Sequence, residues 1–190
     1  MKTIQLTPSC KDYLWGGEKL RTEYGIQSEL HPLSEAWMLS CHPDGPSYLP
    51  DGSTFQQYIN THPGCLGTHC EKFSEFPVLA KLIDAKKDLS IQVHPSNEYA
   101  LEHEHQYGKT EMWYVLDCEP GAFLYYGFDH EISREELEER IRNNTLTEVL
   151  NAVPVKKGDC FFIPSGTLHA ICKGVVVAEV QLLEKSRRRT

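Results

Sequence analysis

Residues 158–169 read GDCFFIPSGTLH, and this stretch decides the fold. Four of its residues, Gly158, Pro164, Gly166 and His169, stand at the intervals G-x5-P-x-G-x2-H, and an apolar run precedes the proline. A glycine suits a turn that starts a strand, and the later proline and glycine fix a bend that few other residues allow. The pattern therefore predicts two strands joined by a tight bend, with His169 at the start of the returning strand.

Two further segments, QVHP (92–95) and GKTE (108–111), carry polar side chains at the spacing of a β-strand face. Side chains two positions apart in a strand share a face, so Gln92 and His94 should point the same way, as should Lys109 and Glu111. Together with the histidine at 169, the segments offer an amide oxygen, two imidazoles and a carboxylate. This mixed nitrogen and oxygen set suits zinc or another divalent ion.

A rival set of metal ligands exists in the same region. His103 and His105, followed by Glu111, give an H-x-H…E pattern that could also hold a metal. Residues 96–98 read Ser-Asn-Glu, which indicates the start of a helix over 97–105 that would turn the two histidines to different sides. The interpretation with His94 is therefore preferred.

The cysteines indicate reduced thiols and no disulfide framework. Their number is seven, which is odd, and none of them forms a CxxC pair. One cluster, His62, Cys65, His69 and Cys70, could gather thiol ligands for a second metal. Its spacing is tighter than that of zinc fingers and it lies in a Pro/Gly turn, so a polar loop with incidental thiols is the preferred interpretation.

Three longer runs carry a resemblance to a known family. They are residues 76–100, which contain SIQVHP, residues 108–128, which start with GKTEMWYVL, and residues 155–181, which contain PSGTLHAI. The third run resembles the second cupin motif. Taken together the runs are similar to type I mannose-6-phosphate isomerase in its short bacterial form, and YLWGG (13–17) and SEAWMLS (34–40) fit the same family.

The resemblance implies a zinc-dependent aldose–ketose isomerase that interconverts mannose 6-phosphate and fructose 6-phosphate, so the expected partner is a phosphorylated hexose. It implies one zinc ion as cofactor, and it places Lys109 in the substrate pocket as a candidate catalytic residue. The implied metal ligands are Gln92, His94, Glu111 and His169.

The resemblance stops at Gln181. Family members continue past this strand with a run resembling QSSDTTYR, which holds the family's catalytic arginine, and then with a further half of the protein. Residues 182–190 read LLEKSRRRT, an atypical tail in which Arg189 stands at about the expected distance from His169 and is the second candidate catalytic residue. Two other interpretations stay open: a non-catalytic metal-bound cupin that binds a phosphosugar, and an inactive truncated fragment. An iron-dependent oxygenase is less favoured, because Gln92 takes the place of a histidine.

We therefore expect a mainly β fold, a cupin jelly-roll barrel with a few peripheral helices, formed by residues 1–190 as a single domain. Turn residues and periodicity predict where the elements lie. The expected helices are 54–60, 97–105, 133–142 and 146–153, and the expected strands are 90–93, 112–116, 122–126, 160–163 and 174–181.

Composition narrows the class of partner. The formal net charge of −8 disfavours nucleic acid, whose phosphates are held by clustered lysine and arginine. The longest apolar run, around residues 174–183, contains a glutamate and is too short to span a bilayer, so no membrane is expected. No secretory leader is recognisable at the start, and we expect a cytoplasmic protein. The sequence does not define the oligomeric state.

Overall fold

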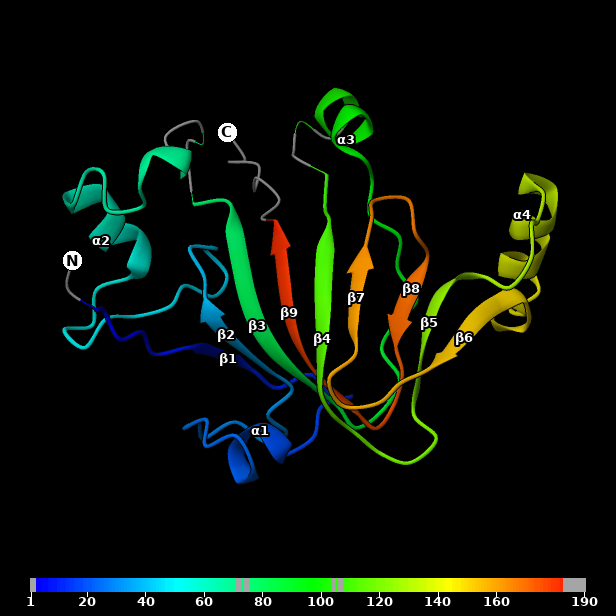
Figure 1. The fold of residues 1–190 in the computed structure, drawn as a ribbon, viewed down its shortest axis with the longest axis horizontal. Helices are drawn as coiled ribbons and strands as arrows, with labels where there is room; N and C mark the ends of the chain where they lie inside the picture. Colours follow the sequence, from blue (N-terminus) through cyan, green and yellow to red (C-terminus); the bar gives the residue numbers. More distant parts are fainter. Residues whose placement is uncertain (1–2, 71–72, 74–75, 104, 106–107, 183–190) are drawn as a thin grey trace.

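The structure is a computed structural model that describes residues 3–70, 73, 76–103, 105 and 108–182. Two antiparallel sheets dominate it, a six-stranded sheet in the order β1-β2-β3-β9-β4-β7 and a three-stranded sheet in the order β6-β5-β8 (Figure 1). The strands are β1 (Ser9–Lys11), β2 (Glu35–Leu39), β3 (Val78–Ala85), β4 (Glu111–Cys118), β5 (Phe123–Phe128), β6 (Leu150–Pro154), β7 (Cys160–Ile163), β8 (His169–Ile171) and β9 (Val175–Leu182).

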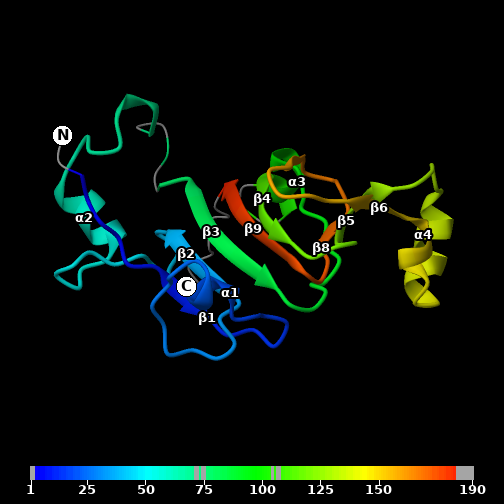
Figure 2. The same cartoon turned by 60° about the horizontal axis from the view of Figure 1, so that its bottom comes forward.

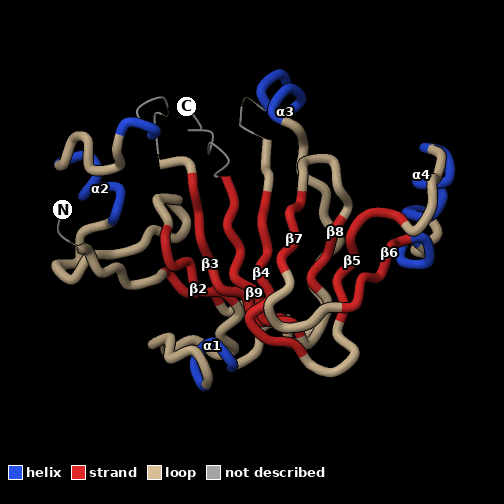
Figure 3. Tube along the Cα trace, viewed as in Figure 1, coloured by secondary structure: helices blue, strands red, loops and turns tan. Residues whose placement is uncertain are grey.

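The helices are short and lie around the sheets (Figure 3). They are α1 (Lys19–Thr22), α2 (Phe55–Thr61), α3 (Asn97–His103) and α4 (Arg134–Arg142), with 3-10 turns at Thr68–Cys70 and Leu146–Val149. Helices α2 and α4 lie at opposite ends of the molecule in both ribbon views (Figure 1, Figure 2). The prediction of a mainly β fold with peripheral helices is confirmed. Within the described residues, no helix combines the length and the apolar character that crossing a bilayer requires.

The main core fills the space between the two sheets. Ile83, Val115 and Val177 project from the large sheet, and Leu124 and Ile171 project from the small one. All five are buried, and they alternate along their strands with residues that point to the other side, as the pleat of a strand requires. This inward side of the six-stranded sheet is called the inner face below, and the opposite side is called the outer face.

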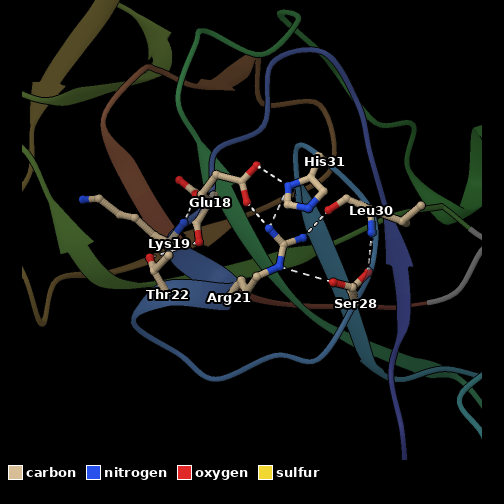
Figure 4. A network of polar contacts seen from close by, with 8 residues as sticks. Glu18, Lys19, Arg21, Thr22, Ser28, Leu30 and His31 are labelled. Carbon is tan, nitrogen blue, oxygen red and sulfur yellow. Dashed lines mark hydrogen bonds and ion pairs between the residues drawn. The ribbon is translucent and has the colours of Figure 1, made fainter.

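A second core covers part of the outer face. Leu20 of α1, together with Ile26 and Leu33 from the loop that follows, packs on Ala36 of β2 and Val176 of β9. Polar contacts hold this loop in place (Figure 4). The guanidinium of Arg21 donates to the carbonyl oxygens of Ser28, at 3.2 Å, and of Leu30, and it is paired with Glu18. The guanidinium of Arg21 thereby links α1 to Ser28 and Leu30 of this loop.

Most of the expected elements are confirmed with small shifts at their ends. Residues 160–163 form β7, and the expected strands at 112–116, 122–126 and 174–181 lie within or beside β4, β5 and β9. The side chain of Thr54 caps α2 by accepting from the N–H of Gln57, and Ser133 caps α4 by accepting from the N–H of Glu136. The helix expected over 97–105 is α3, which ends at His103.

Two expectations are wrong. Residues 146–153 do not form a helix, because only 146–149 make a 3-10 turn and Leu150–Pro154 pair with β5 as strand β6. Proline at 154 and valines at 149 and 153 disfavour a helix, so pairing with a neighbouring strand prevails. Residues 90–93 are not a strand either, since only Gln92 makes an isolated bridge, with His169.

Candidate metal centre

Three side chains from distant segments meet at one end of the space between the sheets. Glu111 is the first residue of β4, His169 is the first residue of β8, and His94 lies in the loop before α3. Their ligand atoms all lie within 4.8 Å of one another. Among the residues that the structure describes, this is the one group of three or more His, Cys, Asp or Glu side chains close enough to share an ion.

The carboxylate of Glu111 lies at the centre of the group. Its Oε1 is 3.4 Å from Nε2 of His94 and 2.6 Å from Nζ of Lys109, and its Oε2 is 3.5 Å from Nε2 of His169. Glu111 and His169 are buried, and the other two side chains are largely covered. The expected juxtaposition of Lys109 and Glu111 is therefore confirmed.

The protonation of His169 is fixed by a backbone contact. Its Nδ1 lies 2.8 Å from the carbonyl oxygen of Thr167, which can only accept, so Nδ1 carries the proton. The unprotonated Nε2 then faces Glu111, as in metal sites where a second hydrogen bond orients a histidine ligand. Nε2 of His94 is buried and has no hydrogen-bond partner. A divalent ion at this point would satisfy both nitrogens, so the residues fit a metal.

The surroundings of Glu111 and His169 favour the protonation states that bind a metal ion. Burial alone would raise the pKa of Glu111, but contacts with His94 and with the ammonium of Lys109 outweigh it and hold that pKa far below its ordinary value. Burial also lowers the pKa of His169, which favours the neutral imidazole. An ionised carboxylate and a neutral imidazole are the forms that bind metals.

Backbone hydrogen bonds hold the segments together. The N–H of Gln92 donates to the carbonyl of His169, and the N–H of His169 donates back to the carbonyl of Gln92, both at 2.9 Å. The N–H of Gly166 donates to the carbonyl of His94 at 2.7 Å. The bend around Pro164 and Gly166 thus helps to position both histidines. His169 starts the strand that follows the bend, and His94, whose carbonyl accepts from the N–H of Gly166, lies in a separate loop.

Gly108 allows the loop before α3 to approach the segment before β4. A Cβ atom at this position would lie 2.5 Å from both the carbonyl oxygen of Pro95 and the carbonyl carbon of Ser96. Its N–H donates to Oδ1 of Asn97 at 2.8 Å, and the next N–H, of Lys109, donates to the carbonyl of Pro95 at 3.3 Å. Only glycine fits here without moving the backbone.

The other predicted site residues have different outcomes. Gln92 lines the cavity beside Glu111 and its amide donates to Oγ of Ser90 at 3.0 Å, so its role as a fourth ligand stays a prediction. Arg189 lies outside the described residues. His103 is on α3 and is not part of the group around Glu111, which agrees with the preference for His94. The cluster of histidines and cysteines at 62–70 does not form a metal-binding group.

The sequence interpretation missed a set of buried charges in the same cavity, whose volume is about 260 Å³. Nζ of Lys81 lies 3.3 Å from Oε1 of Glu179 and 3.8 Å from Oε2 of Glu35, and the indole N–H of Trp113 donates to Glu179 at 3.0 Å. Burial would lower the pKa of Lys81, but the two carboxylates raise it. A signal existed, because Lys81 and Glu179 are charged residues in strands whose inward faces also have the apolar residues Ile83 and Val177.

Comparisons with known proteins show which family the sequence resembles. Residues 3–120 match the family model described as phosphomannose isomerase type I, catalytic domain. The mannose-6-phosphate isomerase of Streptococcus mutans is 42% identical over 172 residues, which are 88% of this chain and 54% of that protein. The chain spans about half the length of the curated relatives it matches.

Solved structures show the same fold. The crystal structure of the mannose 6-phosphate isomerase from Bacillus subtilis superposes with a TM-score of 0.89 at 38% identity, over 98% of this chain and 60% of that one. A mannose 6-phosphate isomerase bound with zinc and yttrium has a TM-score of 0.74 at 20% identity, over 96% of this chain and 68% of that one, and so shares the fold.

Proposed function

Because this chain belongs to the type I phosphomannose isomerase family, we propose that its buried centre interconverts mannose 6-phosphate and fructose 6-phosphate. The convergence of His94, Glu111 and His169 beside Lys109, at a cavity open to a small ligand, is the observation that carries the proposal. The similarity of known isomerases over nearly the whole chain supports it.

The proposed cofactor is one zinc ion. Two imidazole nitrogens and a carboxylate suit zinc, and the unpartnered Nε2 of His94 gives a physical reason for an ion at this point. Gln92 is the proposed fourth ligand, since it lines the same cavity and its backbone pairs with His169. The zinc found in a mannose 6-phosphate isomerase of this fold supports the choice of metal.

The chemistry explains why these residue types are needed. An aldose–ketose isomerisation moves a proton between C2 and C1 of the open-chain sugar, and negative charge develops on the neighbouring oxygens as the enediol forms. A bound divalent ion would act as a Lewis acid toward that charge. The ammonium of Lys109, largely covered and fixed by Glu111, adds positive potential at the same place.

The rest of the cavity suits a ligand rich in hydroxyl groups. Glu35 and Glu179 supply acceptors and Lys81 supplies donors to the cavity, and the aromatic rings of Tyr13 and Trp15 also line it. The charged groups are held by one another and by indole N–H groups, so they are already ordered in the free protein. A polar ligand would therefore enter a site whose charges are already oriented.

A coupled assay for fructose 6-phosphate, with mannose 6-phosphate and zinc supplied, tests the proposal. The chain should turn over substrate, and Glu111→Ala should lower kcat/KM by at least about 100-fold, because it removes the central ligand. Glu138→Ala, which removes a carboxylate on α4 far from the site, is the matched control and should leave activity unchanged. Turnover no higher than that of Glu111→Ala would exclude the enzymatic function.

A second candidate is a metal-bound protein that binds a phosphosugar without turning it over. It is favoured by one observation: the chain spans about half the length of its curated relatives. Calorimetric titration with mannose 6-phosphate separates the two functions. Zinc-dependent binding without any turnover would select the second candidate, and turnover would select the first.

A further inference from the structure

The outer face of the six-stranded sheet has an open half that consists of six uncharged side chains. Across the strands Met112 pairs with Val180 and Phe162, and Tyr114 pairs with Ala178 and Cys160, so the six form two adjoining rows on β9, β4 and β7. Phe162 is 62% exposed and Tyr114 is 43% exposed. We call these residues the open half of the outer face.

The other half of the same face is covered. On β9, Val176 packs under Leu20 of α1 and is 1% exposed, whereas Val180, which points to the same side four residues later, is 37% exposed. The Arg21 contacts shown in Figure 4 fix the loop that provides this cover. The chain therefore protects one half of an apolar surface and leaves the adjoining half in water.

The outward residues of these strands are those of a covered face. Antiparallel strands with one face in solvent normally place polar residues on that face. None of the six outward side chains carries a charge. Contiguous exposed apolar surface of this kind marks interaction sites in folded proteins.

We propose that the open half binds the region of a full-length family member that lies outside the part this chain matches, through an apolar surface of that region. The length comparison supports this occupant. The chain superposes over 98% of its residues on the Bacillus subtilis isomerase but covers 60% of that protein, which therefore contains a further body of structure. The resemblance places this region after the strand that is β9 here, and Val180 of β9 belongs to the open half.

The test mixes the chain with the separately produced region of the Bacillus subtilis isomerase that the chain does not match. Light scattering after gel filtration should show a one-to-one complex. The double variant Phe162→Ser, Val180→Ser should weaken it at least tenfold. Ile141→Ser, which removes an equally exposed apolar side chain from α4, is the matched control and should not weaken it. A complex insensitive to the double variant would overturn the proposal, as would a dimer of this chain that the double variant abolishes.

A second measurement decides the case in which the separate region does not bind. The same region is fused after residue 182, and maleimide labelling of exposed Cys160 is followed by mass spectrometry. Labelling should be at least tenfold slower in the fusion than in the chain alone, while a cysteine introduced as Glu138→Cys on α4 reacts equally in both. Cys172 is buried, and burial raises its pKa to about 11, so its labelling would report unfolding. Equal rates at Cys160 in the two proteins would overturn the proposal.

Discussion

The inner and outer faces of the six-stranded sheet are built from alternate residues of the same strands, yet their chemistry is opposite. The inner face buries Lys81, Glu111 and Glu179 within the cavity, whereas the open half of the outer face has no charged side chain and is exposed. Buried ion pairs add little net stability compared with apolar packing. The comparison fits the two proposals made above, a ligand at the inner face and contact with protein at the open half of the outer face.

Removing a metal ligand from the site beside the inner face should have the largest effect. We expect His94→Ala to weaken zinc binding by at least about 100-fold, because even partners of metal ligands contribute 10- to 100-fold. For the unmodified chain, zinc at about 100 times its Kd should raise the free energy of unfolding by about 2.7 kcal/mol. Zinc content after gel filtration and thermal unfolding measure both. Phe162→Ser on the outer face should bind zinc like the unmodified chain. If Phe162→Ser also lost zinc, the two faces would not differ in the way described.

The next prediction compares neighbouring residues of β4 that point to opposite faces. Trp113→Phe removes the N–H that donates to the buried carboxylate of Glu179, and should lower the free energy of unfolding by about 2 to 3 kcal/mol. Tyr114→Phe removes a hydroxyl from the exposed face and should change it by less than about 0.5 kcal/mol. Urea denaturation measures both. Similar losses for the two variants would show that Tyr114 is covered in solution.

A third prediction compares the two halves of the outer face on one strand. Val176→Ala should cost about 2 kcal/mol, from two lost methyl groups and the space they leave under α1. Val180→Ala makes the same chemical change in the open half and should cost about 0.5 kcal/mol or less. Equal costs in denaturation experiments would mean that α1 does not cover Val176 as the structure shows.

The smallest effect concerns the ion pair that links α1 to the sheet. The ammonium of Lys19 donates to Asp117 at 2.8 Å and lowers the pKa of that carboxyl below its ordinary value of 3.8. Because the folded pKa is the lower one, the pair stabilises the protein above pH 3.8 and this contribution is lost as the pH falls through the folded pKa. Both groups are partly in solvent, so Asp117→Asn should cost about 0.5 kcal/mol or less at pH 7. The cost should shrink at pH 3 and in concentrated salt, and a constant cost would contradict the assignment.

The sequence predicted the elements whose geometry depends on local turn chemistry. Gly158 and Pro164 bound β7 in the structure as they do in the sequence pattern, and Ser133 caps α4 through its hydroxyl. It failed where pairing with distant strands overrode local preference. Residues 150–153 were expected to end a helix, but they pair with β5 as part of the edge strand β6.

The candidate site was predicted in part for a reason that the structure does not share. Strand alternation led us to place Gln92 and His94 on one face, but this segment is a loop held by backbone contacts with His169 and Gly166. The resemblance to the family was therefore the stronger guide to His94. Lys81 and Glu179 were missed because their meeting depends on the register between β3 and β9, which no local pattern contains.

The close approach of two backbone segments at Gly108 affects how loss-of-function variants would be understood. Any side chain there pushes apart the loop that carries His94 and the segment that carries Lys109 and Glu111, although residue 108 itself offers no atom to an ion or a sugar. A genetic screen would therefore recover substitutions at 108 among the most severe and group them with those of true ligands. Only a coordinate-level view separates a residue that touches the chemistry from one whose missing atoms leave room for it.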